Sequence, residues 1–293
     1  MSRNDKRIYN NNKIQDKPKT IKNKIKQMKN ILCLVLFVFV FGLTGCVPKI
    51  SEPRFVFKES EKNAESAREV FLKANQNKKD LENYHANLKM EAIVYMPTFL
   101  NLNIKTSLQL KSAINSGKES VHETGRVKGR LFGIYKNSDH EIYYDNQEGK
   151  GYFREKEDKN WKEIHTKNPM EILMDYGTIA SFIPDNTQFK EKRGTYIVTI
   201  SAKDINILEI ISAVNPSVGK IIGNADIKDG ALIYEFDKET MFLEEISLSS
   251  LELREKFSGR NCRITMDGNI LFSQFNKIAA EKYHIPKNLI KTN

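Results

Sequence analysis

Apolar and polar positions alternate with two different periods along the body of this chain. Between Glu59 and Asn77, apolar residues recur at helical spacing among charged ones, which predicts an amphipathic helix. Apolar residues occupy every second position over Ala86–Met96 and most of the alternate positions over Leu102–Ile114, and Pro97-Thr98 separates the two runs. These runs predict two long antiparallel strands, each with one apolar side and one solvent-facing side.

The rest of the pattern predicts two more helices and several strands. One helix begins at Asn168-Pro169 and runs through Ile179, and a strongly apolar helix covers Ile205–Val214. Asp229-Gly230 and Asp267-Gly268 are typical of hairpin turns and divide the C-terminal third into short strands. The fold class is therefore α+β with a large meandering antiparallel sheet. The other strands are expected at Glu119–Arg126, Leu131–Tyr135, Glu141–Tyr144, Gly151–Arg154, Thr187–Lys192 and Thr195–Ser201.

The N-terminal part has the pattern of an export signal. The run Ile31–Leu43 holds 13 apolar or small residues, whereas a spanning helix needs about 20. Leu43-Thr44-Gly45-Cys46 directly follows and resembles the lipobox of bacterial prolipoproteins. That resemblance implies cleavage between Gly45 and Cys46 and diacylglycerol on the Cys46 thiol, with a possible further acyl chain on the new amine. The protein is then expected to sit on the extracytoplasmic face of the cell membrane, held by its lipid.

Three parts of the chain follow from this interpretation: an export signal over 1–45, a lipidated tether over 46–58 and a single domain over 59–293. Translation starting at Met28 would give a compact signal, since Met28-Lys29-Asn30 stands directly before the apolar run. The alternative is a long basic cytoplasmic tail that cleavage removes.

Charge and cysteine content narrow the function classes. The formal net charge is +10, but the first 30 residues hold ten basic and two acidic side chains, so only +2 remains from Cys46 onward. The mature domain is nearly neutral, and its charge gives no reason to expect a nucleic-acid partner. Cys262 is the only cysteine of the body and cannot form an internal disulfide.

Two stretches of the body resemble a known family. One runs from Tyr143-Tyr144-Asp145 through Gly149–Arg154 to Trp161-Lys162; the other joins Tyr234–Lys238, Phe272–Lys277 and Ile285–Ile290. Both are similar to small lipoproteins of Gram-positive bacteria in the LolA/LppX-like superfamily, including its DUF6612-type branch, over roughly residues 60–290. The resemblance implies a strongly curved antiparallel sheet, a half-barrel, with helices against its concave face. In some members lipids or lipidated clients lie between sheet and helices.

A wide one-faced sheet must bury its apolar side, and three short helices can leave part of it open to a hydrophobic ligand. The alternative for each of these positions is an ordinary closed core. The residues expected to line such a pocket are Leu88, Met90, Val94, Leu102, Ile104, Leu108, Ile207, Ile211, Leu232 and Ile246.

The sequence carries no pattern of catalytic chemistry. It lacks a GxSxG motif, a P-loop and a dinucleotide fingerprint, so no enzyme activity and no cofactor are expected. The five histidines are dispersed without metal-site spacing, and a surface position is expected for each. Asp139, Glu141 and Asp145 could hold calcium but lack the usual loop. Tyr143, Tyr144, Tyr152, Phe153 and Trp161 suit either a ligand platform or cross-strand pairing.

Two functions remain open from the sequence. The first is a membrane-anchored lipoprotein that binds or carries a lipid or lipidated molecule in an apolar cavity. The second is a non-enzymatic structural, protein-interaction or sensory lipoprotein with a closed core. A monomer is expected in both cases.

Overall fold

A computed structural model describes residues 55–96, 102–115, 120–131, 134–145, 149–158, 160–164, 174–205, 225–257, 260–286 and 289. All of them belong to one compact unit, Gly42–Asn293. Met28, Gly45 and Cys46 lie outside the described residues, and so does the apolar helix expected after Ile205. Over the residues that the structure describes, no helix has both the length and the apolar character that crossing a membrane requires.

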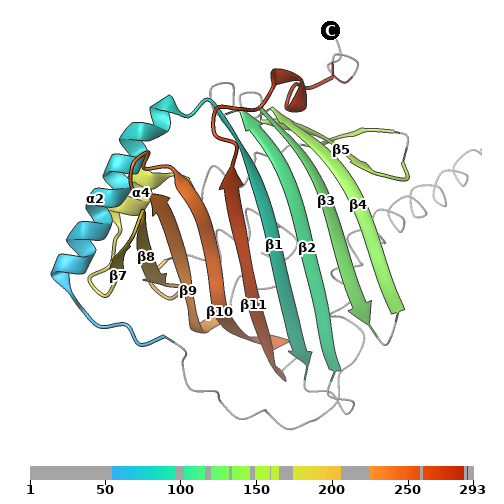
Figure 1. Cartoon of the computed structure of the whole chain (residues 1–293). Coiled ribbons are helices and arrows are strands. Elements are labelled where there is room, and N and C mark those ends of the chain that lie inside the picture. The colour runs from blue at the N-terminus through green and yellow to red at the C-terminus, as the bar shows by residue number, and fades with distance from the viewer. Residues whose placement is uncertain are drawn as a thin grey trace, which may run out of the picture. The chain divides into compact units, whose positions relative to one another are not determined.

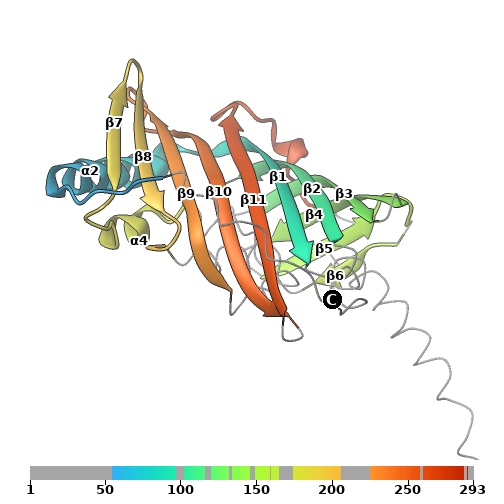
Figure 2. The same cartoon turned by 90° about the horizontal axis from the view of Figure 1, so that it is seen from below.

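The dominant element is a strongly curved, open antiparallel sheet of 11 strands, as the sequence predicts (Figure 1, Figure 2). The chain starts at the centre with β1, steps outward to β6 at one edge, continues at the opposite edge with β7, and returns inward until β11 pairs with β1. The strands are β1 Asn83–Met96, β2 Leu102–Asn115, β3 Ser120–Leu131, β4 Ile134–Asp145, β5 Lys150–Glu155, β6 Lys162–Ile164, β7 Gln188–Lys192, β8 Thr195–Ser201, β9 Asp226–Asp237, β10 Leu243–Phe257 and β11 Arg260–Ser273.

Helix α2, Glu61–Asn77, packs on the concave face beside β7–β9 (Figure 1). The Ser60 side chain caps α2 by accepting a hydrogen bond from the Asn63 amide. The short helix η1, Lys78–Asp80, follows α2 directly. Phe71 is fully buried, with its ring 5.1 Å from that of Tyr234 and 5.2 Å from that of Phe236 on β9. The predicted helix at 59–77 is thus confirmed.

Helix α4, Tyr176–Ser181, is shorter than the sequence predicts. The expected start at Asn168-Pro169 lies outside the described residues, but one continuous helix from there to Ile179 is wrong, because residues 174 and 175 are not helical and Asp175 is the N-cap of α4. The Asp175 carboxylate accepts from the Thr178 amide at 3.1 Å and also from the Thr178 hydroxyl. An Asp that closes its own turn competes with a longer helix and places the start at the next residue.

Strands β3 and β4 are longer than the alternation of apolar residues predicts. The expected break between 126 and 131 and the gap between 135 and 141 lie inside continuous strands. The inward positions in the gap on β4 include Ser138 and His140, which face the concave side although they are not apolar. A pattern search reads such positions as a gap in the strand, whereas backbone pairing continues through them.

Both Asp-Gly pairs were expected to be hairpin turns, and both expectations are wrong. Asp229-Gly230 lies within β9 and Asp267-Gly268 within β11, on either side of an irregularity in β10 between Leu248 and Leu251. There Ser250 has a positive φ of 54°, and its amide donates to the Asp267 carboxylate at 2.7 Å. A Cβ on Gly230 would lie 2.8 Å from the Leu251 Cα. The pairs therefore accommodate a β-bulge.

The C-terminal segment, residues 274–286, packs on the outer face of the sheet and contains the short helix η2, Ala280–Lys282. Ile278 and Tyr283 form a small apolar cluster with Ala113 of β2, whose neighbours Ser112 and Ile114 point to the opposite face. The Ile278 amide donates to the Asn83 side chain at 2.8 Å. Both faces of the central strands are thus partly covered.

Candidate functional site

The concave face is where the sequence places a hydrophobic site, and its expected lining residues differ in burial. Three of them are 2–3% exposed and belong to the core: Leu88, Leu232 and Ile246. Three are partly buried and pack against that core: Met90, Val94 and Leu108. Two lie on β2 with side chains outside the described part: Leu102 and Ile104. Two lie outside the described residues altogether: Ile207 and Ile211.

Burial along β1 decreases toward its C-terminal end. Ala86 and Leu88 are at most 3% exposed, whereas Met90, Ala92 and Val94, on the same face, are only partly buried. Leu108 pairs with Met90 across β1 and β2 and is partly buried too. These four residues, here called the apolar shelf, leave apolar surface accessible on the concave side. The structure brings three of the predicted lining residues together on it.

A small group of polar side chains lies on the same face as the apolar shelf, beyond Leu110. Glu123 of β3 is 3% exposed, and its Oε2 accepts from the Ser112 hydroxyl at 3.3 Å. Its Oε1 lies 3.7 Å from His140 Nε2 of β4. Burial, and then the charge of Glu123, raise the pKa of Tyr144 well above its ordinary value. Sequence reasoning missed this group; continuing the alternation from Val121 through Glu123 would have found it.

The surface position expected for His140 is wrong, since its side chain is only 12% exposed. The absence of a side chain at Gly125 lets the His140 ring lie against the neighbouring strand on the concave face. A Cβ on Gly125 would lie 2.1 Å from His140 Cε1 and 2.6 Å from Leu110 Cδ2, so the imidazole occupies the space that a side chain would fill. The glycine is required here by close approach.

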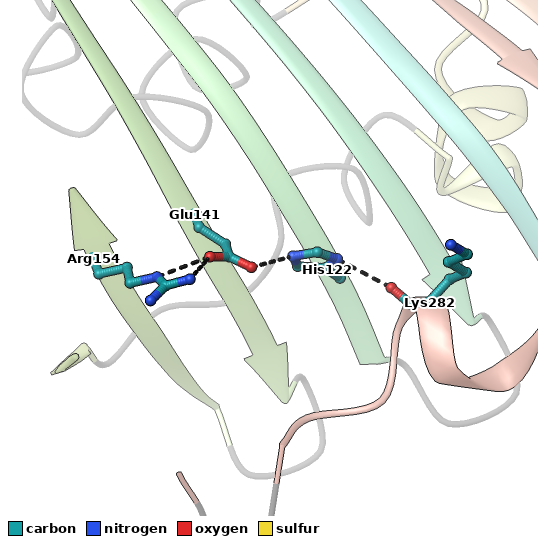
Figure 3. A network of polar contacts seen from close by, with 4 residues as sticks. All are labelled: His122, Glu141, Arg154 and Lys282. Atoms are coloured by element: carbon teal, nitrogen blue, oxygen red, sulfur yellow. Dashed lines mark hydrogen bonds and ion pairs between the residues drawn. The ribbon is translucent and has the colours of Figure 1, made fainter. Parts of the chain in front are cut away.

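A second polar arrangement crosses the outer face and ends at the C-terminal segment (Figure 3). Glu141 of β4 accepts from Arg154 Nε of β5 at 2.8 Å and also from Arg154 Nη2. The other Glu141 oxygen lies 2.8 Å from His122 Nε2, and His122 Nδ1 lies 3.1 Å from the Lys282 carbonyl oxygen. Both ring nitrogens lie within hydrogen-bond distance of an oxygen. His122 thus ties the C-terminal segment to the sheet.

The acidic group around Asp139 and Glu141 is engaged with cations of the chain itself. Asp139 accepts from Arg126 at 2.7 and 3.0 Å, which lowers the pKa of Asp139. Burial would raise the pKa of Glu141, but hydrogen bonds from Arg154 and His122 outweigh it, and the pKa lies below its ordinary value. Within the described ranges, no cluster of His, Cys, Asp and Glu is arranged as a metal site.

The aromatic residues of β4–β6 divide between the two faces. Tyr143 stacks on His122 with ring centroids 4.3 Å apart and an interplanar angle of 9°, and Trp161 lies 5.5 Å further on. Arg154 covers the Trp161 ring at 4.5 Å. Tyr144 points to the opposite face and is buried in the core. These rings pair with one another and with neighbouring strands, which agrees with the cross-strand alternative rather than a single platform.

Comparisons with known proteins give a family and two solved structures. No curated protein matches the chain. A DUF1329 family protein from Desulfovibrio piger ATCC 29098 has 10% identity and a TM-score of 0.27, with 78% of this chain and 99% of that chain covered. A β-barrel-like protein of the domain of unknown function DUF1849 from Brucella abortus has 7% identity and a TM-score of 0.26, with 65% and 98% covered. TM-scores this low carry no argument about function.

The family model of DUF6612, a family of unknown function, matches residues 66–293. That match begins within α2 and covers all 11 strands of the sheet. The chain therefore belongs to the DUF6612 family.

Proposed function

We propose that this protein is a lipoprotein anchored through Cys46 on the extracytoplasmic face of the membrane, and that it binds a hydrophobic ligand on the concave face of its half-barrel. The anchor is supported by the order of basic stretch, short apolar run and Leu43-Thr44-Gly45-Cys46. The ligand is supported by the resemblance to the LolA/LppX-like superfamily. Two acyl chains on Cys46 give stable membrane attachment, since each buried methylene contributes about 0.8 kcal/mol.

The apolar shelf carries the proposal. Met90, Ala92, Val94 and Leu108 continue the same inward face as the closed core, yet they are only partly buried. Apolar surface of this kind, on the inside of a curved sheet, binds an apolar molecule by removing that surface from water. The shelf lies on long, regularly paired strands, so its shape is maintained without a ligand.

A matched pair of substitutions tests the ligand site. Leu108→Glu places a charge on the concave face, and Leu271→Glu places the same charge on the outer face, where Leu271 is 39% exposed. With a dansyl-labelled undecanoic acid as probe, we expect Leu108→Glu to weaken binding by roughly tenfold or more, because a desolvated charge is unfavourable. Leu271→Glu should bind like the wild type. Equal affinities in both variants would locate the probe elsewhere.

The anchor has its own test. The Cys46→Ala variant has no thiol to receive diacylglycerol, so metabolic labelling with a radioactive fatty acid should be lost and the protein should leave the detergent phase. Unchanged labelling of Cys46→Ala would refute the lipobox interpretation.

The burial of Leu88, Leu232 and Ile246 favours the second function, because these residues belong to a closed hydrophobic core. In that case the protein acts through its surface, as a structural, interaction or sensory lipoprotein. The probe experiment separates the two functions: a chain that acts only through its surface gives no saturable binding.

A further inference from the structure

The strand register divides the concave face into an apolar and a polar part. In one row across the sheet, Ile246 of β10, Ile270 of β11 and Leu88 of β1 are neighbours, and all are buried and apolar. The same row continues on the other side of β1 through Leu110 to Gly125 and His140. The side chains therefore change from apolar to polar between β2 and β4.

The adjacent row is polar on β2 and β3 and apolar again at Ile142 of β4. It passes from Ala86 to Ser112 and then to Glu123. Ser112 and Glu123 are 2% and 3% exposed, on a face that is otherwise apolar near β1. Ser112, Glu123 and His140 are here called the polar corner.

Glu123 is incompletely satisfied by the contacts that define the polar corner. The Ser112 bond, at 3.3 Å, is long for a hydroxyl donating to a carboxylate, and the 3.7 Å separation from His140 Nε2 exceeds hydrogen-bond distance. A carboxylate removed from water is unfavourable unless donors surround it closely. The polar corner therefore has capacity for a closer donor.

The polar corner and the apolar shelf are near enough for one molecule to touch both. Leu108 of the apolar shelf and Ser112 of the polar corner are four residues apart on the same strand and face, which corresponds to about 13 Å, with Leu110 between them. Leu110 in turn lies against the Gly125 position where the His140 ring sits. His140 keeps 12% of its side chain exposed, so the polar corner is not wholly closed from that side.

We infer that the concave face takes an amphiphile with one alkyl chain and a head group that donates hydrogen bonds, such as a hydroxyl or an ammonium. The chain lies on the apolar shelf, and the head group donates to Glu123. A donating head group is required because an ionised carboxylate only accepts. This inference rests on the proposed hydrophobic ligand and specifies its class.

Two probes with the same alkyl chain test it. Monolaurin carries two hydroxyl donors, and methyl laurate carries an ester with none. The full chain with Cys46→Ser, which cannot be diacylated, is titrated with each in competition with the dansyl probe. Because hydrogen bonds to charged groups are the strong ones, we expect monolaurin to bind about tenfold more tightly than methyl laurate.

Variants assign the preference to the polar corner. Glu123→Gln keeps the shape and removes the charge, and should reduce the preference for monolaurin to about threefold or less, with methyl laurate unchanged. Gly125→Ala should displace the His140 ring and reduce the preference as well, whereas Gly177→Ala on α4 meets only ordinary contacts and is the control. Thermal melts establish that each variant is folded.

The outcomes separate this inference from the proposed function. Failure of both probes to bind would overturn the proposed ligand site. If the protein that carries only Cys46→Ser binds both probes equally well, the amphiphile inference is wrong and the hydrophobic site remains. A preference that persists in Glu123→Gln and Gly125→Ala would show that the head group lies away from the polar corner, which also contradicts the inference.

Discussion

Phe71 should be among the most sensitive positions of the domain, because it joins α2 to the sheet. Its ring is fully buried and makes edge-on contacts with Tyr234 and Phe236, and it lies 6.2 Å from the Tyr176 ring of α4. A buried Phe removes roughly 150–250 Å² from water, which at about 25 cal/mol per Å² is about 4–6 kcal/mol. Measured Phe→Ala substitutions in cores cost about 3–5 kcal/mol, in agreement. We therefore expect Phe71→Ala to lower the free energy of unfolding by about 4 kcal/mol.

Guanidinium chloride unfolding, followed by far-UV circular dichroism, measures this change. The neighbouring Leu72→Ala is the control on the same helix, since Leu72 is 46% exposed and should lose less than about 1 kcal/mol. A fall of less than about 1 kcal/mol in Phe71→Ala would mean that α2 does not pack on β9 as described. A loss of α2 alone, with the sheet intact, would appear as a first, smaller transition.

Three further predictions concern pH and the outer face. Because folding lowers the pKa of Glu141, the ionised carboxylate stabilises the fold above the ordinary glutamate pKa, and this stabilisation is lost as pH falls through the pKa of the folded state. Glu141→Gln should therefore make the free energy of unfolding depend less on pH below about pH 5. Burial raises the pKa of Tyr234, so its stabilising contribution is present below about pH 10 and is lost as pH rises further; Tyr234→Phe should move the midpoint of alkaline unfolding upward. His122→Phe keeps an aromatic ring but loses both polar contacts, so hydrogen exchange should become faster in the C-terminal segment, and a result equal to that of the exposed control His284→Phe would contradict the role of His122.

The elements with strong periodicity could be predicted from the sequence. Helix α2 and strands β1 and β2 follow from apolar spacing alone, because each has one predominantly apolar face. Strands β7 and β8 follow from the turn residues between them, where Gly194 has a φ of 81°. The predicted fold class is confirmed, and its curvature was implied by the family resemblance.

The strands that were misjudged share one cause. An Asp-Gly pair has the same local preference in a hairpin turn and in a β-bulge, and only the position of β10 distinguishes the two for Gly230. Likewise, β4 has inward residues such as Ser138 and His140, and the His140 ring is accommodated there because Gly125 of β3 has no side chain. Pairing between distant residues decided these cases, and the local pattern does not contain it.

The candidate site was predictable where it depends on alternation along one strand, and not where it depends on pairing between strands. Met90, Val94 and Leu108 could be assigned to one face by alternation, and the structure places them together on the apolar shelf. The polar corner depends on the register of β2, β3 and β4, which brings residues 112, 123 and 140 together. Alternation from Val121 assigns Glu123 to the inward face, but it does not indicate which residues of β2 and β4 lie beside it.

Native mass spectrometry of the full chain with Cys46→Ser, released from gentle detergent, tests the hydrophobic ligand most directly. We expect a fraction of the protein to carry one bound amphiphile, visible as a discrete added mass that solvent extraction removes. This fraction should be smaller in Leu108→Glu than in Leu271→Glu. A chain that always appears at its own mass, and that fails to take up monolaurin or methyl laurate when either is supplied, would contradict the account.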